Sequence, residues 1–379
     1  MKPASVADYR EAARRRLPRV LFDYIDGGAY AEETLAANVG DLQALKLRQR
    51  VLRDVSKLST ETQVFGQTLS MPVVLSPVGM AGMYARRGER QAAKAAKAAG
   101  VPFALSTVGV CSVSEVAEAA GTPPWFQLYM TKDRGFMAEV LAHTAEIGCP
   151  VLLFTVDLPV PGTRYRDVRN GMIASSAAER LSQAMDGLAH PAWLWDVQFH
   201  GRPHTLGTVA KAATELKSLT DYWRWIGANF DASVTWDDIA WVRSQWKGPI
   251  VLKGVLDVAD ARLAADLGVE GLVVSNHGGR QLDGAPSSIH ALPPIAQAVG
   301  DRVSVLMDGG VRSGLDVLKA LASGARACLL GRAWAWALGA RGEAGVAHML
   351  EIVRQELRVA MALTGCVDVT SASADLLAD

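Results

Sequence analysis

The sequence predicts an α/β fold, a (β/α)8 or TIM barrel, with an N-terminal helical segment and a long insertion after strand 4. Eight short apolar runs alternate with alanine-rich stretches of helical spacing, and polar residues follow nearly every run. No G-x-G-x-x-G motif follows an early strand, which argues against a Rossmann domain. The 379 residues are 50% hydrophobic and 21% charged, so one large domain over residues 1–379 is expected.

The elements follow in order along the chain. Residues 1–60 are expected to be mostly helical, and residues 61–72 to form a small hairpin that closes the bottom of the barrel. The expected strands are residues 72–76, 102–106, 125–129, 151–156, 249–253, 271–275, 303–307 and 327–331. Helices are expected over residues 87–100, 113–121, 132–148, 257–268 and 313–324, each with a glycine near its end, as a helix C-cap favours.

The connection between the fourth and fifth strands is unusual, because about a hundred residues separate them and most such connections are far shorter. Its central part, residues 171–235, holds Trp193, Trp195, Trp223 and Trp225 among arginines and lysines. Aromatic and basic residues in this combination are typical of segments that lie in a membrane interface. A lid or a subunit contact packed with tryptophan is the alternative interpretation.

Composition excludes several classes of function. Lys+Arg and Asp+Glu balance at 39 each, so nothing indicates a nucleic-acid partner. Four cysteines lie far apart without a CxxC or Cys/His cluster, which predicts reduced thiols and no metal site. The N-terminus has no apolar signal-peptide core, and no uninterrupted apolar run is long enough to span a membrane.

Active-site residues of such barrels lie at the C-terminal ends of the strands, and seven of these eight ends carry polar or charged groups. We expect these groups to converge on one mouth. In strand order they are Pro77, Val78 and Gly79; Ser106; Gln127 and Tyr129; Thr155 and Asp157; Lys253; His277 and Arg280; Asp308, Gly309 and Gly310; and Gly331 and Arg332.

The last two strand ends predict a phosphate site, since glycine N–H groups, a helix N-terminus and two arginines, Arg312 and Arg332, occur together there. His277 is a candidate base, Asp157 a carboxylate that raises its basicity, and Arg280 a bidentate clamp for an anion. Lys253 could serve as a Schiff-base nucleophile or as a fixed cation beside an anionic cofactor ring. The chain is therefore expected to bind an acidic substrate next to a phosphorylated cofactor.

Several motifs together resemble those of the FMN-dependent L-2-hydroxy-acid dehydrogenase and oxidase family. They are SNHGGRQLD, the KG of VLKG, DGGVRSG with LLGR, FQLY, and TVD followed by PGTRYRD. The resemblance covers nearly the whole chain. It looks closest to the bacterial respiratory L-lactate dehydrogenase branch in FDYIDGGA, LSMPVVLSPVGMAGMYARRGE, LSTVGVCS and the tryptophan-rich insertion.

The resemblance implies a role for each matching position. His277 abstracts a proton from the 2-hydroxy acid, Asp157 stabilises the imidazolium, and Lys253 stabilises the reduced, anionic cofactor, which decides against a Schiff base. The implied substrate-binding residues are Tyr24, Tyr129, Arg164 and Arg280. Pro77, Val78, Gly79, Ser106, Gln127 and Thr155 are expected to hold the flavin ring, Asp308 the ribityl chain, and Gly309, Gly310, Arg312, Gly331 and Arg332 the phosphate.

The implied reaction is FMN-dependent oxidation of L-lactate to pyruvate, with electrons passed to an external acceptor, a quinone of the respiratory chain. The resemblance also implies peripheral association with the cytoplasmic face of the inner membrane and a homo-oligomer, a tetramer. Three alternatives stay open: an oxidase that uses O2, a dehydrogenase of a larger acid such as L-mandelate, and a phosphate-binding barrel aldolase or isomerase that uses Lys253.

Overall fold

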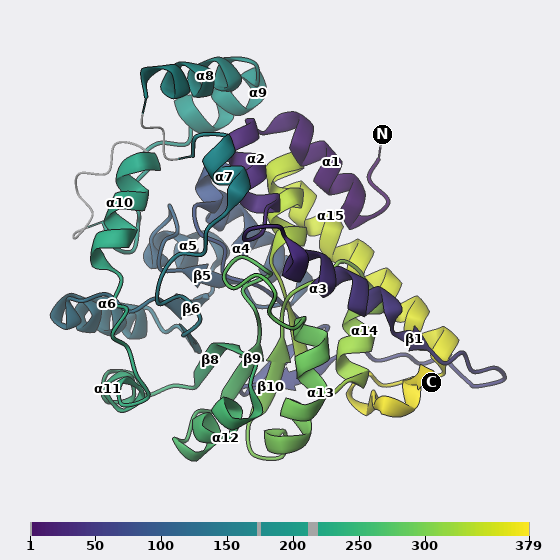
Figure 1. Ribbon diagram of the computed structural model, residues 1–379. Helices are drawn as coiled ribbons and strands as arrows, with labels where there is room; N and C mark the ends of the chain where they lie inside the picture. Colours follow the sequence, from purple (N-terminus) through teal and green to yellow (C-terminus); the bar gives the residue numbers. More distant parts are fainter. Residues whose placement is uncertain (1, 173–175, 211–218, 379) are drawn as a thin grey trace.

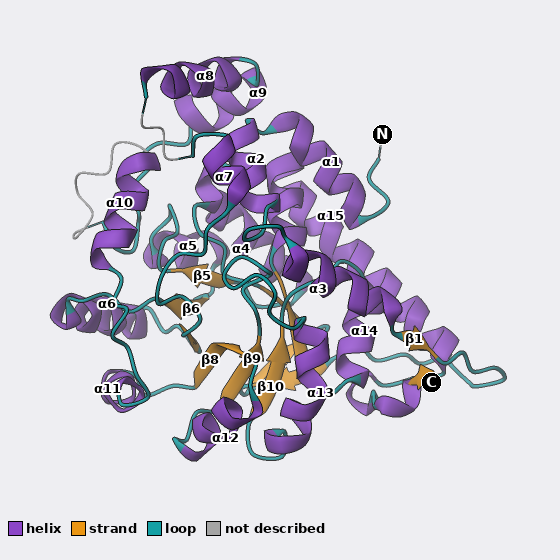
Figure 2. Cartoon of the chain, in the orientation of Figure 1, coloured by secondary structure: helices purple, strands orange, loops and turns teal. Residues whose placement is uncertain are grey.

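The computed structural model describes residues 2–172, 176–210 and 219–378, and its centre is a ring of eight parallel strands surrounded by helices (Figures 1 and 2). The strands are β4 (Val73–Leu75), β5 (Ala104–Ser106), β6 (Trp125–Leu128), β7 (Leu152–Thr155), β8 (Ile250–Val255), β9 (Gly271–Val274), β10 (Ser304–Met307) and β11 (Ala327–Leu330). All eight fall on the expected runs, which confirms the predicted barrel.

The ring is closed by neighbours far apart in the sequence. β11 pairs with β4, with Cys328 opposite Val73, while β4 meets β5 through a single bridge between Leu75 and Phe103. Alternate strand residues such as Val251, Val273 and Leu306 are buried together in the barrel interior. The hairpin of β2 (Thr62–Val64) and β3 (Gln67–Leu69) packs against this interior cluster, so it plugs the bottom of the barrel as expected.

Helices cover the outside of the ring. The expected ones are α4 (Gly88–Ala99), α5 (Val113–Ala120), α6 (Arg134–Glu146), α12 (Val258–Asp266) and α14 (Gly314–Ala322). The structure adds α13 (Ser288–Val299), the long α15 (Arg332–Thr364) with non-helical backbone at Arg341 and Gly342, and the short helices η1 (Ala81–Met83), η3 (Val369–Ser371) and η4 (Ala374–Leu376). Because α13 begins only at Ser288, the SNHGGRQLDG stretch is a long loop at the mouth of the barrel.

The N-terminal segment is helical only in part. It forms α1 (Val6–Arg16), α2 (Arg19–Asp26) and α3 (Glu33–Ala44), and α1 packs along α15. The expected helical segment is thus present over residues 6–44, whereas residues 45–60 form no helix. Within residues 45–60, β1 (Lys46–Leu47) pairs with β12 (Leu377–Ala378) near the C-terminus. Local sequence does not indicate a pairing between segments so far apart.

The described part of the insertion after β7 contains the helices α7 (Tyr165–Arg169), α8 (Ala177–Leu188), α9 (Pro191–Trp193), the π-helical η2 (Leu194–Phe199), α10 (Leu219–Asn229) and α11 (Asp238–Gln245). α8 and α9 stand at the top of the molecule in Figure 1, and α10 returns toward the mouth of the barrel. Trp193 and Val197 are buried, whereas Trp195 is exposed. The side chain of Trp223 lies outside the described residues.

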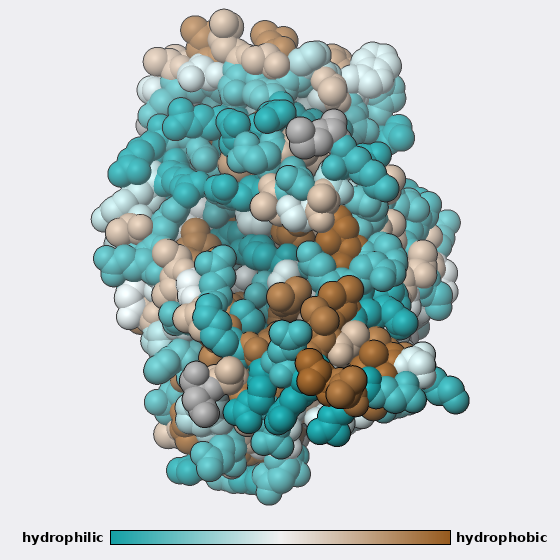
Figure 3. Space-filling model, turned by 90° about the vertical axis from the view of Figure 1, so that its right-hand side faces the viewer, coloured by the Kyte–Doolittle hydropathy of each residue, from teal (hydrophilic) through white to brown (hydrophobic). Residues whose placement is uncertain are grey.

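The surface carries two groups of exposed apolar side chains. One lies on α8 and η2, at the top edge of Figure 3. The other comprises Val51, Leu52, Val359, Leu363 and Val367, near the C-terminal end of α15, on the face that Figure 3 turns toward the viewer. Among the helices of the described chain, none is long and apolar enough to cross a membrane.

Candidate functional site

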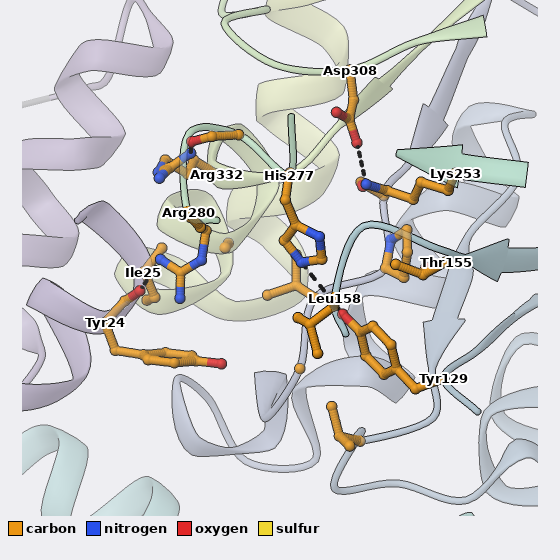
Figure 4. Close-up of a pocket in the computed structure, with 18 of the residues that line it drawn as sticks. Tyr24, Ile25, Tyr129, Thr155, Leu158, Lys253, His277, Arg280, Asp308 and Arg332 are labelled. Atoms are coloured by element: carbon orange, nitrogen blue, oxygen red, sulfur yellow. Dashed lines mark hydrogen bonds and ion pairs between the residues drawn. The ribbon is translucent and has the colours of Figure 1, made fainter. Parts of the chain in front are cut away.

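One cavity opens at the C-terminal mouth of the barrel, and most of the predicted site residues line it (Figure 4). These residues are Tyr24, Pro77, Val78, Gly79, Tyr129, Thr155, Arg164, Lys253, His277, Arg280, Asp308, Gly309, Gly331 and Arg332. Tyr24 comes from α2, so the N-terminal segment supplies part of the wall. The convergence of the strand ends on one site, expected from the sequence, is present in the structure.

Ser106 and Gln127 are fully buried and do not line the cavity. Ser106 Oγ donates to Gln127 Oε1 at 3.0 Å, and Gln127 Nε2 donates to Thr155 Oγ1 at 3.0 Å. This chain of hydrogen bonds crosses β5, β6 and β7, and of its three members only Thr155 reaches the cavity. Ser106 and Gln127 thus fix the orientation of the threonine hydroxyl.

His277 and Asp157 form the ion pair that the sequence predicted. His277 Nδ1 lies 2.8 Å from Asp157 Oδ1, and His277 Nε2 lies 3.3 Å from the Tyr129 hydroxyl. An ionised carboxylate can only accept, so Nδ1 carries the hydrogen of this bond, and Nε2 is the ring nitrogen that faces Tyr129. Burial alone would raise the pKa of Asp157, but the charge and hydrogen bond of His277 and the charge of Lys253 hold it below its usual value.

Asp157 can approach because residue 254 is a glycine. A Cβ on Gly254 would lie 2.4 Å from the carboxylate carbon of Asp157, and the backbone there has φ +109°. The glycine of the KG motif therefore makes room for the carboxylate behind the histidine.

The turn that carries His277 is strained and is held from α3. His277 itself has φ +57°, in the left-handed region that non-glycine residues seldom adopt. Asn276 Oδ1 accepts from Gly279 N at 3.0 Å, and the side-chain amides of Asn276 and Asn38 exchange hydrogen bonds of 2.8 and 2.9 Å. Asn38 was not among the predicted site residues, because a single asparagine in a helical stretch does not indicate a hydrogen bond with Asn276.

Two arginines lie close to the Tyr24 ring. The guanidinium carbon of Arg280 lies 4.7 Å from the ring centroid, and that of Arg164 lies 5.4 Å from it. Arg164 pairs with Asp167 at 2.7 Å, whereas Arg280 is hydrogen-bonded to the backbone carbonyls of Tyr24 and Gly27. Burial, followed by the charge of Arg164, lowers the pKa of Arg280. A partly buried cation that has no carboxylate partner among the described residues favours binding of an anion such as a substrate carboxylate.

Lys253 is not suited to act as a Schiff-base nucleophile. Its ammonium lies 2.9 Å from Asp308 Oδ2 and 3.0 Å from Ser275 Oγ. Burial would lower the pKa of Lys253, but the charges of Asp308 and Asp157 outweigh burial and raise it. The amine therefore stays charged, which favours the fixed-cation alternative over the aldolase.

The phosphate end of the predicted site departs in part from expectation. Gly309 and Gly331, the N-cap of α15, line the cavity, but Gly310 and Arg312 do not. A Cβ on Gly310 would lie 2.0 Å from the Asn38 carbonyl, so Gly310 lets α3 pack against the loop. Arg312 is stacked 4.9 Å over the Trp336 ring, and burial lowers its pKa to about 10. A phosphate role for Gly310 and Arg312 stays a prediction.

Arg332 lines the cavity, and its guanidinium donates to the carbonyls of Gly278 at 2.8 Å and Gly27 at 2.7 Å. Burial, and then the charges of Arg280 and Arg312, lower its pKa well below the usual value. Arg332 thus connects the turn that carries His277 to the C-terminal end of α2 through hydrogen bonds. It also adds positive charge at the helix N-terminus, where a phosphate is stabilised.

The donor set fits a flavin mononucleotide. Asp308 Oδ1 is buried and has no hydrogen-bond partner within the described part of the chain, which is what an acceptor for a ribityl hydroxyl requires. Lys253 supplies a cation for the ring, and Gly309 with Gly331 supply backbone N–H groups at the phosphate end.

Several apolar residues in the cavity wall could not be predicted from the sequence. Leu158 and Pro161 follow β7, Ile226 comes from α10, and Phe230 stacks 5.0 Å from Tyr129. Apolar residues on a long connection carry no chemical signal of their own. The insertion length was the one available hint, because long loops commonly cover barrel mouths.

Comparison with known proteins identifies the family. The model of the FMN-dependent dehydrogenases matches residues 13–379. The chain belongs to the FMN-dependent dehydrogenase family. FMN is therefore the cofactor of this FMN-dependent dehydrogenase, as the donor set indicates.

Relatives of this dehydrogenase include a protein of Caulobacter sp. (strain K31) named L-lactate dehydrogenase, which is 61% identical over 96% of this chain and 95% of its own. A Pseudomonas aeruginosa protein of the same name is 56% identical, over 98% and 97%. Among solved structures, monotopic membrane protein (S)-mandelate dehydrogenase has a TM-score of 0.92 at 36% identity and covers both chains completely.

Proposed function

We propose that this chain oxidises L-lactate to pyruvate with bound FMN as the oxidant. The observation that carries the reaction is the position of His277 in the cavity wall, with Asp157 hydrogen-bonded to Nδ1 and Arg280 in the same wall. The relatives named L-lactate dehydrogenase are 55–61% identical, whereas the mandelate enzymes are 36–38% identical, so L-lactate is the better-supported acid.

His277 takes the proton from the substrate, and Asp157 stabilises the imidazolium that results. Their 2.8 Å contact is already formed, so little reorganisation accompanies the proton transfer. Bound FMN supplies the two-electron acceptor. Lys253, held between Asp308 and Ser275, presents a fixed positive charge to the cofactor site.

Arg280, Arg164, Tyr24 and Tyr129 bind and orient the acid. Arg280 and Arg164 supply positive charge for the carboxylate, and both lie close to the Tyr24 ring. Burial, followed by the Asp157 charge, raises the pKa of Tyr129, so its hydroxyl stays protonated and can donate to the substrate.

The test is anaerobic addition of L-lactate to the purified holoenzyme. We expect the yellow flavin absorbance to bleach with L-lactate at a much higher kcat/KM than with L-mandelate, and not with D-lactate. A preference for L-mandelate would support the larger acid instead. Rapid peroxide release in air, at a rate equal to turnover with a dye, would indicate an oxidase. Absence of bleaching with any 2-hydroxy acid would contradict the proposal.

We also propose that a respiratory quinone takes the electrons and that the chain lies peripherally on the cytoplasmic face of the inner membrane. The contact surface would be the outward face of α8 and η2, where Leu181, Met185, Leu188, Trp195 and Phe199 are each 62–65% exposed. The three α8 residues lie on one face of the helix, because they are spaced at i, i+4 and i+7. A homo-oligomer stays a prediction.

Replacing Leu181 and Met185 by glutamate together should abolish sedimentation with phospholipid vesicles. Each buried apolar side chain contributes about 1.5–3 kcal/mol, so the loss should exceed about a hundredfold in partition. The matched control is Leu263→Glu on α12 together with Leu267→Glu at its C-cap, two exposed leucines at the opposite end of the molecule. If the α8 variant sediments as the unaltered protein does, α8 is not the contact surface.

A further inference from the structure

A second cavity lies between the insertion and the body of the barrel. α8, α9 and η2 form one side, and Pro18, Met80, Met83 and Val110 form part of the other. Most of its lining is apolar, including the ring of Trp193, whose Nε1 donates to the Met83 carbonyl at 2.8 Å. Thioether and indole surfaces of this kind pack well on a flat ring.

The mouth of this cavity opens on the exposed apolar surface of the insertion. Leu188 and Phe199 both line the cavity and are 65% and 64% exposed. They lie beside Leu181, Met185 and Trp195, the other members of the proposed membrane contact. A ligand dissolved in the membrane could therefore enter without crossing water.

The wall between this cavity and the FMN site is thin. Gly79 lines the FMN site and the next residue, Met80, lines the second cavity. Likewise Val108 lines the first and Val110 the second, and Met80 N donates to the Val108 carbonyl at 3.1 Å. One layer of residues thus separates the two sites, a short path for electrons.

His204 contributes a buried imidazole to this cavity, and the Val197 carbonyl lies near it. Both ring nitrogens of His204 are buried, and neither forms a well-aligned hydrogen bond with any residue that the structure describes. Buried polar atoms are nearly always hydrogen-bonded, so an unsatisfied imidazole points to a missing ligand. Burial, and then the charges of Arg202 and Arg87, lower the pKa of His204 and outweigh the opposite effect of the Val197 carbonyl, so the ring is neutral and carries one N–H.

We propose that this second cavity binds the ring of the quinone acceptor, with the His204 N–H donating to a quinone carbonyl. The inference rests on the proposed function, which supplies the electrons. It balances: oxidation of one 2-hydroxy acid to the 2-oxo acid releases two electrons and two protons, and reduction of one quinone to the hydroquinone consumes both. The apolar tail of the quinone would leave past Leu188 and Phe199 toward the membrane.

Two variants and a control test the site on the oxidised holoenzyme. His204→Gln removes the imidazole, and Gly187→Leu fills the cavity from α8. A Cβ on Gly187 would meet the Trp193 ring at an ordinary 3.6 Å, and leucine is a better helix former than glycine, so this variant should fold. His200→Gln changes an exposed histidine on the same segment and serves as the control.

The first measurement is calorimetric titration with decylubiquinone. The Kd should rise about tenfold in His204→Gln, as expected for loss of a buried hydrogen bond, and by at least about tenfold in Gly187→Leu. It should not change in His200→Gln. Unchanged affinity in both test variants would overturn the proposal, as would decanol binding as tightly as the quinone, since that result would indicate an acyl-chain site.

The second measurement separates this inference from the proposed function. Enzyme reduced anaerobically with L-lactate is mixed with decylubiquinone, and the return of the flavin absorbance is followed. In both variants the ratio of the quinone-linked to the dye-linked rate should fall about tenfold. If L-lactate never bleaches the flavin, the proposed function fails. If it does, and quinone reoxidises variants and unaltered enzyme alike, only the cavity assignment fails.

Discussion

Replacing His277 by glutamine should leave a yellow protein with almost no turnover. Glutamine cannot accept the substrate proton at the position of Nε2, and a general base contributes roughly 10²–10⁴ in rate. FMN should still bind, because Lys253, Asp308, Gly309 and Gly331 are unchanged around the cavity. The measurement is kcat with L-lactate and an artificial dye, alongside the flavin absorbance of the purified protein.

The control for this variant is His290→Gln, since His290 lies exposed on α13, outside the site. It should turn over as the unaltered enzyme does. A His277→Gln protein with normal kcat would show that the base lies elsewhere. A colourless protein would show instead that the turn of residues 276–279 shapes the cofactor site, a separate finding that the absorbance spectrum reveals directly.

Replacing Arg280 by lysine should raise the KM for L-lactate by on the order of 10- to 100-fold, because lysine cannot reproduce the planar pair of hydrogen bonds to a carboxylate. Arg280 also donates hydrogen bonds to the carbonyls of Tyr24 and Gly27, so the substitution should also make the position of Tyr24 in the substrate site less fixed. The readout is the steady-state KM together with the concentration dependence of anaerobic flavin bleaching.

Arg302→Lys provides the matched control, since Arg302 is a surface residue paired with Asp266. Its KM should not change. If Arg280→Lys shows the KM of the unaltered enzyme, the substrate carboxylate binds elsewhere, and Arg164 would be the next residue to vary. A fall in kcat alone, with KM constant, would likewise contradict a role in substrate binding.

The barrel and the chemistry at its mouth could be predicted from local patterns in the chain. Strand and helix periodicity are local properties, so all eight strands and five of the helices could be placed from apolar spacing and glycine caps. Parallel strands must end on one side, so His277, Asp157, Lys253 and Arg280 could be expected to meet without any knowledge of contacts.

The contacts between segments far apart in the chain could be seen only in the folded structure. Asn38 holds Asn276 from α3, Gly254 clears space for Asp157, and Asp308 pairs with Lys253. The cavity containing His204 exists only because the insertion folds back on Met80 and Val110. Side-chain pairing across such separations depends on how elements pack, and no periodicity in a single sequence records it.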